Sequence, residues 1–250
     1  AVGASDADAG SLSGDCLSGD WVASVASRLQ RAACVVMHGA GAGRSGGRAE
    51  AAPRVGAAAA DPSVSAVWVA RTCQQLAAKL FNASQPRRAA CLADCCVEQL
   101  RRAAGGGAEE AALLCSAHQI GAHSGLQAKP PAPLEARGHV LAAIQIRCAA
   151  LDAEGGGGAG AAASRPSVRD LCALHVSCLV RGVSEGVLSD DGAELDHVVW
   201  ALPPPARRLV VRLELEETAQ QLGRLREAAA ARYLHRYAEM VGRRLLGLLP

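Results

Sequence analysis

The sequence is poor in aromatic residues, with one Phe, two Tyr and three Trp among 250 residues. Aromatic side chains usually contribute much of the buried area of a core. Leu, Val, Cys and Ala must therefore form the core here, through close approach of faces that carry small residues. Lysine occurs only at Lys79 and Lys129. The residues in excess (Ala, Gly, Arg and Pro) have GC-rich codons, so codon bias alone explains the many arginines.

The chain also lacks a strong charge of either sign and lacks long apolar runs. Its net charge is +2, which gives no global electrostatic preference for nucleic acid or for an anionic membrane. No stretch reaches the roughly 18 consecutive apolar residues of a membrane-spanning helix, so we expect no membrane insertion. The acidic N-terminal residues do not form the basic-then-apolar pattern of a secretory signal.

Ten cysteines are scattered along the chain, most of them inside apolar helical patterns. A secreted disulfide framework is typical of a shorter, loop-rich chain, whereas a buried free cysteine behaves as a small hydrophobic residue. We therefore expect free thiols and an intracellular protein in a reducing compartment. The sequence does not distinguish cytoplasm, nucleus and organelle interior.

The alanine-rich composition favours helices over strands, and the pattern divides the chain into three parts. Residues 1–62 are largely low-complexity with one short helix, residues 63–205 form a helical domain, and residues 206–250 form a C-terminal helical segment. Helices are expected in pairs, as in an α-solenoid, but no repeat consensus recurs. We predict an all-α fold: an irregular helical bundle or short α-solenoid of paired helices with Gly/Ala-rich loops and a long C-terminal helix.

The clearest pattern is an apolar stripe between Thr218 and Leu249, which predicts one amphipathic helix. This stripe packs either on the protein's own core or on a partner, and it is the candidate partner-binding site. Its members are Leu222, Leu225, Tyr233, Tyr237, Met240, Leu245 and Leu248.

The stretch 208–216 alternates apolar residues with Arg208, Arg212, Glu214 and Glu216. This alternation fits a half-buried strand with one face in solvent as well as a helix. An isolated strand would leave its backbone hydrogen-bonding groups without partners. No second convincing strand exists in the sequence, so we favour a helix that continues into the C-terminal segment.

A glycine-rich loop at 39–47 is the most enzyme-like feature. Residues 41–46 have the G-x-G-x-x-G pattern of a dinucleotide-binding turn. An Ala/Pro/Gly-rich stretch follows instead of an amphipathic helix, however, and no parallel sheet is predicted. A linker is the favoured interpretation.

Three groups of Cys and His residues have spacings that invite a metal site, but each also fits an apolar helical stripe. We interpret them as packed side chains and expect no metal and no cofactor. The groups are Cys91 with Cys95, Cys115 with His118 and His123, and Cys172 with His175 and Cys178.

Arginine pairs recur at Arg87–Arg88, Arg101–Arg102, Arg207–Arg208 and Arg243–Arg244. On adjacent helices they could form a ridge for phosphate backbones. Acidic residues are nearly as numerous, and no aromatic residue is interleaved for base stacking. Nucleic acid is therefore a possible partner but not the favoured one.

No catalytic constellation stands out, and the clear features are packing surfaces. We therefore expect a non-catalytic helical scaffold, a subunit that mediates protein–protein interaction in a larger assembly, and not an enzyme. The first alternative is a nucleic-acid-binding helical protein that uses the arginine pairs. The second is a nucleotide-binding enzyme that uses the loop at 39–47.

Overall fold

The protein is all-α. The computed structural model describes residues 62–103, 107–153, 167–188 and 193–247, with positions 24, 25, 27–29 and 31. Within the four long ranges there are eight helices and no strand. The helices are α2 (Pro62–Asn82), α3 (Pro86–Ala103), α4 (Ala108–Gln127), α5 (Pro133–Ala153), α6 (Val168–Ser184), α7 (Ala193–Ala201), α8 (Pro204–Leu222) and α9 (Ala228–Gly247).

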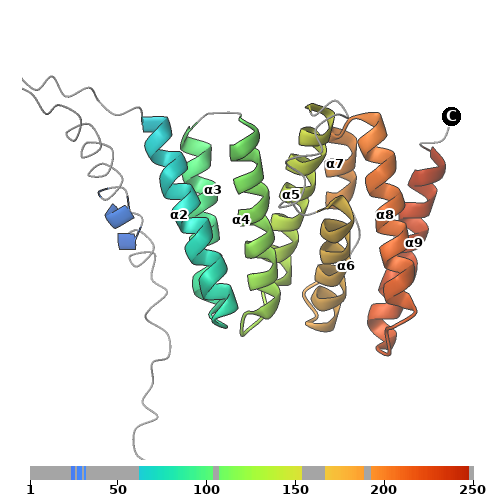
Figure 1. Cartoon of the computed structure of the whole chain (residues 1–250). Helices are drawn as coiled ribbons and strands as arrows, with labels where there is room; N and C mark the ends of the chain where they lie inside the picture. Colours follow the sequence, from blue (N-terminus) through green and yellow to red (C-terminus); the bar gives the residue numbers. More distant parts are fainter. Residues whose placement is uncertain are drawn as a thin grey trace, which may run out of the picture.

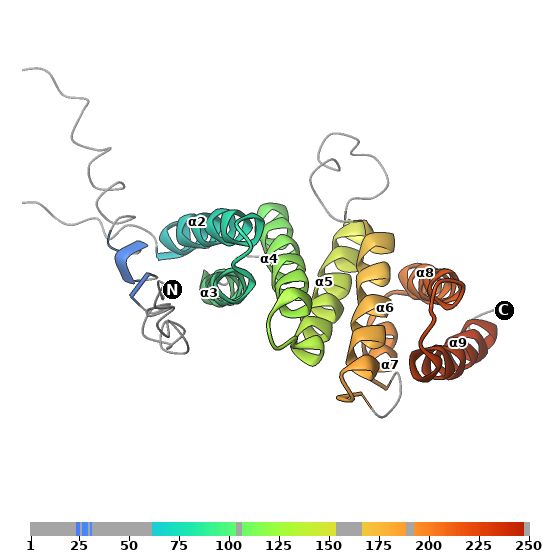
Figure 2. The same ribbon diagram turned by 90° about the horizontal axis from the view of Figure 1, so that it is seen from below.

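The helices stand side by side in a row, with α2 at one end and α9 at the other (Figure 1). Helices that follow each other along the chain pack together from α2 to α6, and α8 packs on α9. The even-numbered helices also contact one another in succession, α2 with α4, α4 with α6 and α6 with α8. Seen from below, α2 lies beside α3 and α8 beside α9 (Figure 2). The expected all-α fold of consecutively packed helices is confirmed.

Local sequence signals set many of the helix ends. Four helices, α2, α3, α5 and α8, begin with a proline, which has no N–H to leave unsatisfied and is preset for the first turn. A capping box begins α6: Ser167 Oγ accepts from the Asp170 N–H at 3.1 Å, and Asp170 Oδ2 accepts from the Ser167 N–H at 3.2 Å. Gly186 follows the other end of α6 at φ +69°, where a side chain would be strained.

The core consists of two clusters built mainly from small and aliphatic side chains. The first joins α2 and α3 with one alanine of α4, around Val69, Leu92 and Leu100. The second joins α4 to α9, around Ile144, Leu171 and other fully buried residues. Residues 206–241 contribute to this second cluster, so the C-terminal segment shares its core with α5 and α6.

Helices α4 and α5 approach each other closely because glycine lies between them. A Cβ atom added at Gly125 would meet the Ala136 Cβ at 3.1 Å and the Ala132 carbonyl oxygen at 3.2 Å. A Cβ atom at Gly121, one turn earlier, would meet the ring of His139 at 3.0 Å. This contact is an instance of the small-residue packing that the scarcity of aromatic residues implies.

The single helix predicted from Thr218 to Leu249 is wrong: two helices occupy this segment. Helix α8 ends at Leu222, and the N–H of Gly223 closes its last turn on the Ala219 carbonyl oxygen. Glycine is the weakest helix former after proline, and α9 returns to pack on α8 and α6. The chain reverses between α8 and α9 because this places Leu234 and Val241 in the second cluster. The spacing of the apolar stripe alone did not reveal this reversal.

The stretch 208–216 is helical, as favoured from the sequence, and lies inside α8. The glycine-rich loop at 39–47, Leu248 and most of the short helix predicted within residues 1–62 lie outside the described residues.

None of the helices in the described ranges combines the length and apolarity needed to span a membrane.

Candidate functional site

A chain of four buried polar side chains crosses the interior of the second cluster. Arg137 comes from α5, His175 from α6, Glu214 from α8 and Tyr237 from α9, and none is exposed by more than 3%. Arg137 Nε lies 3.4 Å from His175 Nε2. His175 Nδ1 lies 3.1 and 3.2 Å from the two oxygens of Glu214. The Tyr237 hydroxyl donates to Glu214 Oε2 at 2.9 Å. One continuous polar chain therefore joins four helices.

The chemistry of the end groups assigns the protons. Arginine has only donors, so His175 Nε2 must accept from Arg137. The proton of a neutral imidazole then sits on Nδ1, which donates to Glu214. Glu214 accepts from His175 and Tyr237, and the cation of Arg137 lies at the other end of the chain. We refer to these four residues as the polar chain.

Further contacts of Glu214 involve its main-chain carbonyl group and two neighbouring side chains, Tyr237 and Cys172. The Thr218 hydroxyl donates to the Glu214 carbonyl oxygen at 2.7 Å. Burial, together with the carboxylate of Glu214, raises the pKa of Tyr237 well above its usual value. Burial also raises the pKa of the Cys172 thiol, and Glu214 adds to that effect. Tyr237 is therefore a stable phenol donor at neutral pH.

No member of the polar chain lines the groove over α6, the groove along α9 or the groove between α5 and the turn from α7 to α8. A buried ionic chain whose members are hydrogen-bonded to each other fixes which faces of the helices can meet. The geometry therefore supports a positioning role: the chain holds α5, α6, α8 and α9 in one arrangement.

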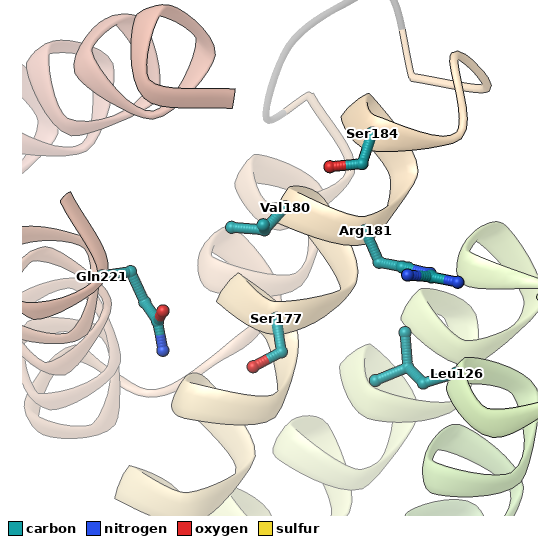
Figure 3. Close-up of a pocket in the computed structure, with 6 residues that line it drawn as sticks. All are labelled: Leu126, Ser177, Val180, Arg181, Ser184 and Gln221. Atoms are coloured by element: carbon teal, nitrogen blue, oxygen red, sulfur yellow. The ribbon is translucent and has the colours of Figure 1, made fainter. Parts of the chain in front are cut away.

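An open groove of about 410 Å³ lies over α6, between α4 and α8. Figure 3 shows Leu126 of α4 on one side, Gln221 of α8 on the other, and the side chains of α6 between them. The α6 residues of the groove are Ser177, Val180, Arg181 and Ser184. We refer to this feature as the α6 groove.

Three polar side chains of the α6 groove have partners within the chain that hold them in place. Ser177 Oγ donates to the Ala173 carbonyl oxygen at 2.9 Å, and Ser184 Oγ donates to Glu227 at 2.5 Å. Arg181 forms an ion pair with Glu185 at 2.9 Å. The result is a shallow surface with apolar patches at Leu126 and Val180 and with oriented polar groups around them.

A second polar cluster joins α3, α4 and α5 near the surface. His118 Nδ1 lies 3.0 Å from His139 Nδ1, and His139 Nε2 lies 3.3 Å from Asp94 Oδ1. Burial, the charge of His139 and that of Arg101 lower the pKa of His118 to about 4. His118 is therefore neutral at physiological pH and accepts a proton only in acid.

The candidate metal spacings do not come together as sites. No three His, Cys, Asp or Glu side chains within the described ranges are placed to hold a metal ion. His175 bonds to Glu214, His118 lies against His139, and the ring of His123 packs near Phe81 with 6.0 Å between centroids. The cysteines of the described part are free thiols, as expected.

The arginine pairs are distributed over α3, α8 and α9, and α3 and α9 lie near opposite ends of the row (Figure 1). At least one member of each pair has a partner within the chain. Arg102 pairs with Glu98 at 3.0 Å, Arg243 pairs with Glu239, and Arg87 donates to the Lys129 carbonyl oxygen. Arg207 donates to the Leu202 carbonyl oxygen and lies over the ring of Trp200. The four pairs therefore do not form one continuous ridge.

The predicted partner-binding stripe lies mostly against the chain's own core. Tyr237 is buried in the second cluster as a member of the polar chain. Five other members are partly buried and pack against that cluster: Leu222, Leu225, Tyr233, Met240 and Leu245. A role of these five in binding a partner stays a prediction.

Two members of the polar chain were not identified from the sequence. Glu214 was placed on the polar side of its segment, but it is fully buried. The available signal was helical spacing: Glu214 lies four residues after Val210 and four before Thr218, and all three are completely buried. Arg137 carried no comparable signal, because its partner His175 lies 38 residues away in the sequence.

Comparison of the chain with protein-family models, with curated proteins and with solved structures finds no match.

Proposed function

We propose that the protein is a non-catalytic helical scaffold that binds a partner protein through the α6 groove. The observation that carries this proposal is the groove itself, which three helices distant in sequence form together on the face of the even-numbered helices. Binding surfaces of this kind are typical of stacked helical arrays, because an extended row exposes a long face that a closed bundle buries.

The side chains of the α6 groove suit a protein partner. Leu126 and Val180 offer apolar contacts, and Ser177, Arg181, Ser184 and Gln221 offer polar groups beside them. Protein–protein interfaces likewise combine apolar contacts with hydrogen-bonding groups. A partner segment with one or two apolar anchors flanked by polar residues would match it.

The polar chain supports the same proposal from the interior. It joins α6 and α8, two of the helices that line the groove, to α5 and α9. A surface that is held in one conformation before binding loses less entropy when the partner arrives. The C-terminal stripe contributes by packing α8 and α9 on the rest of the row.

The proposal is tested by purifying the tagged full chain from its native source, identifying a stoichiometric partner, and measuring the dissociation constant with purified components. Val180→Arg places a charge in the groove, and we expect it to weaken binding about tenfold or more, roughly the loss of one interface anchor. Ala229→Arg, at an exposed position on α9, is the matched control and should bind like wild type.

Equal affinity of Val180→Arg and wild type would remove the groove from the proposal. A monodisperse chain without any stoichiometric protein partner would overturn the scaffold role. Retention of nucleic acid that falls steeply with added salt would replace it with the arginine-pair alternative.

A further inference from the structure

Two cysteines face each other in the first core cluster, across the contact between α2 and α3. Cys73 lies on α2 and Cys95 on α3, and their Sγ atoms are 3.7 Å apart. A disulfide requires a separation of about 2.05 Å, so the sulfurs need to approach by roughly 1.6 Å. Both thiols are free in the structure. Cys91 and Cys96 lie on α3 together with Cys95, so their thiols allow a comparison of reactivity within one helix.

The two thiols are chemically unequal. The Cys73 thiol donates to Cys95 Sγ; this hydrogen bond lowers the pKa of Cys95, and the nearby charge of Arg102 contributes in the same direction. The same hydrogen bond and burial raise the pKa of Cys73. Cys96, with no such donor, has its pKa raised to about 12 by burial. Thiolates, not thiols, are the reactive form, so Cys95 is the nucleophile of the pair.

Access to solvent favours the same residue. Cys95 retains 8% exposure, whereas Cys73 and Cys96 have none. An oxidant as small as hydrogen peroxide fits such an opening better than a bulky disulfide reagent does. Cys73, buried and in contact with Cys95, is placed as the resolving thiol.

We propose that Cys73 and Cys95 are a peroxide-sensitive thiol pair that oxidises to a disulfide between α2 and α3. In the first step the Cys95 thiolate attacks hydrogen peroxide: an S–O bond forms, the O–O bond breaks, and hydroxide leaves and takes up a proton. In the second step Cys73 loses its proton and attacks the Cys95 sulfenic acid: the S–S bond forms, the S–O bond breaks, and water leaves. Two thiols and one peroxide give one disulfide and two waters.

The disulfide would join residues 22 positions apart at the end of the helix row that α2 forms. Such a crosslink restricts the unfolded chain and holds α2 against α3. We therefore expect oxidation to raise the unfolding temperature of the chain, and a reductant to reverse the rise.

The experiment treats the folded full-length chain with a small excess of hydrogen peroxide, blocks the remaining thiols and maps the disulfides by mass spectrometry. We expect a Cys73–Cys95 crosslink as the main product, accompanied by the rise in unfolding temperature. Cys96→Ala, a change of similar size at the adjacent position, should leave the crosslink unchanged. Cys73→Ser keeps a hydroxyl donor beside Cys95 but cannot form the disulfide, so it should leave Cys95 as a sulfenic acid that dimedone traps, a product that wild type does not accumulate.

Circular dichroism of each variant verifies that it is folded before oxidation, and the crosslink map of wild type does not depend on any variant. A main crosslink through Cys91 or Cys96 would overturn the proposal. So would an unoxidised Cys73–Cys95 pair under conditions that oxidise Cys91, which is more exposed. Dimedone labelling of Cys73 in place of Cys95 would reverse the assigned roles and contradict it.

Discussion

The Tyr237 hydroxyl donates a 2.9 Å hydrogen bond to Glu214 Oε2, and both side chains are almost completely removed from solvent. This contact joins α9, the end of the helix row, to α8 and through His175 to α6. A buried carboxylate is costly unless its oxygens are hydrogen-bonded and a cation is near. The polar chain meets these conditions for Glu214 only when all four helices are in place.

Removal of the tyrosine hydroxyl tests the contact directly. Tyr237→Phe keeps the ring but leaves Glu214 with one donor fewer. We expect the free energy of unfolding to fall by about 2 kcal/mol, the usual range for a hydrogen bond to a charged group, measured by urea denaturation. A change below about 0.5 kcal/mol would contradict the role given to this hydrogen bond.

Removal of the carboxylate should have a larger effect. Glu214→Ala leaves the Nδ1–H of His175 and the Tyr237 hydroxyl buried without their acceptor. It also removes the negative charge that balances Arg137 inside the core, and we expect a loss of about 3–5 kcal/mol. Glu214→Gln keeps the shape and should lose less, which provides a measurable variant if the alanine variant does not fold. Glu239→Ala, at an exposed ion pair on α9, is the control and should cost less than about 1 kcal/mol. Equal effects at the two positions would contradict the prediction.

The cluster of His118, His139 and Asp94 predicts a dependence of stability on pH. The pKa of His118 is about 4 in the folded chain and roughly 6.5 in an unfolded one. The unfolded chain therefore binds the proton first, so stability is complete above about pH 6.5 and falls as the pH decreases to about 4. The shift corresponds to roughly 3 kcal/mol. Urea denaturation between pH 7 and pH 4 measures it, and His118→Gln should flatten the slope.

A slope in His118→Gln equal to that of wild type would contradict this assignment. Part of the slope should survive in the variant, because burial also lowers the pKa of His123.

The contact between α4 and α5 predicts opposite effects of the same substitution at two glycines. Gly125→Ala places a methyl group 3.1 Å from the Ala136 Cβ and 3.2 Å from a backbone oxygen, and we expect a loss of about 1–3 kcal/mol from overpacking. Gly138, inside α5, has open space around it. Gly138→Ala should raise the free energy of unfolding by about 0.5–1 kcal/mol through helix propensity. Thermal and urea unfolding compare the pair, and equal signs would contradict the close approach.

Local signals in the sequence predicted that the chain is helical. The alanine-rich composition favours helix at each residue, and the prolines and the Ser167–Asp170 capping box at helix starts act within one turn of the chain, so none of these signals depends on the fold. The apolar stripe was also detected, but its spacing continued across Gly223 although the helix does not. The spacing of apolar residues shows which residues avoid water, but it does not show whether the chain reverses direction between them.

The sequence by itself therefore determined that this protein is helical and that small residues must pack its core. Only the tertiary structure decided that α9 folds back on α8, that Glu214 lies inside, and that Arg137, His175, Glu214 and Tyr237 form one chain. The physical reason is range. Helix formation depends on neighbours a few residues away, whereas the partner of a buried charge comes from another helix, 38 or 39 residues distant for His175.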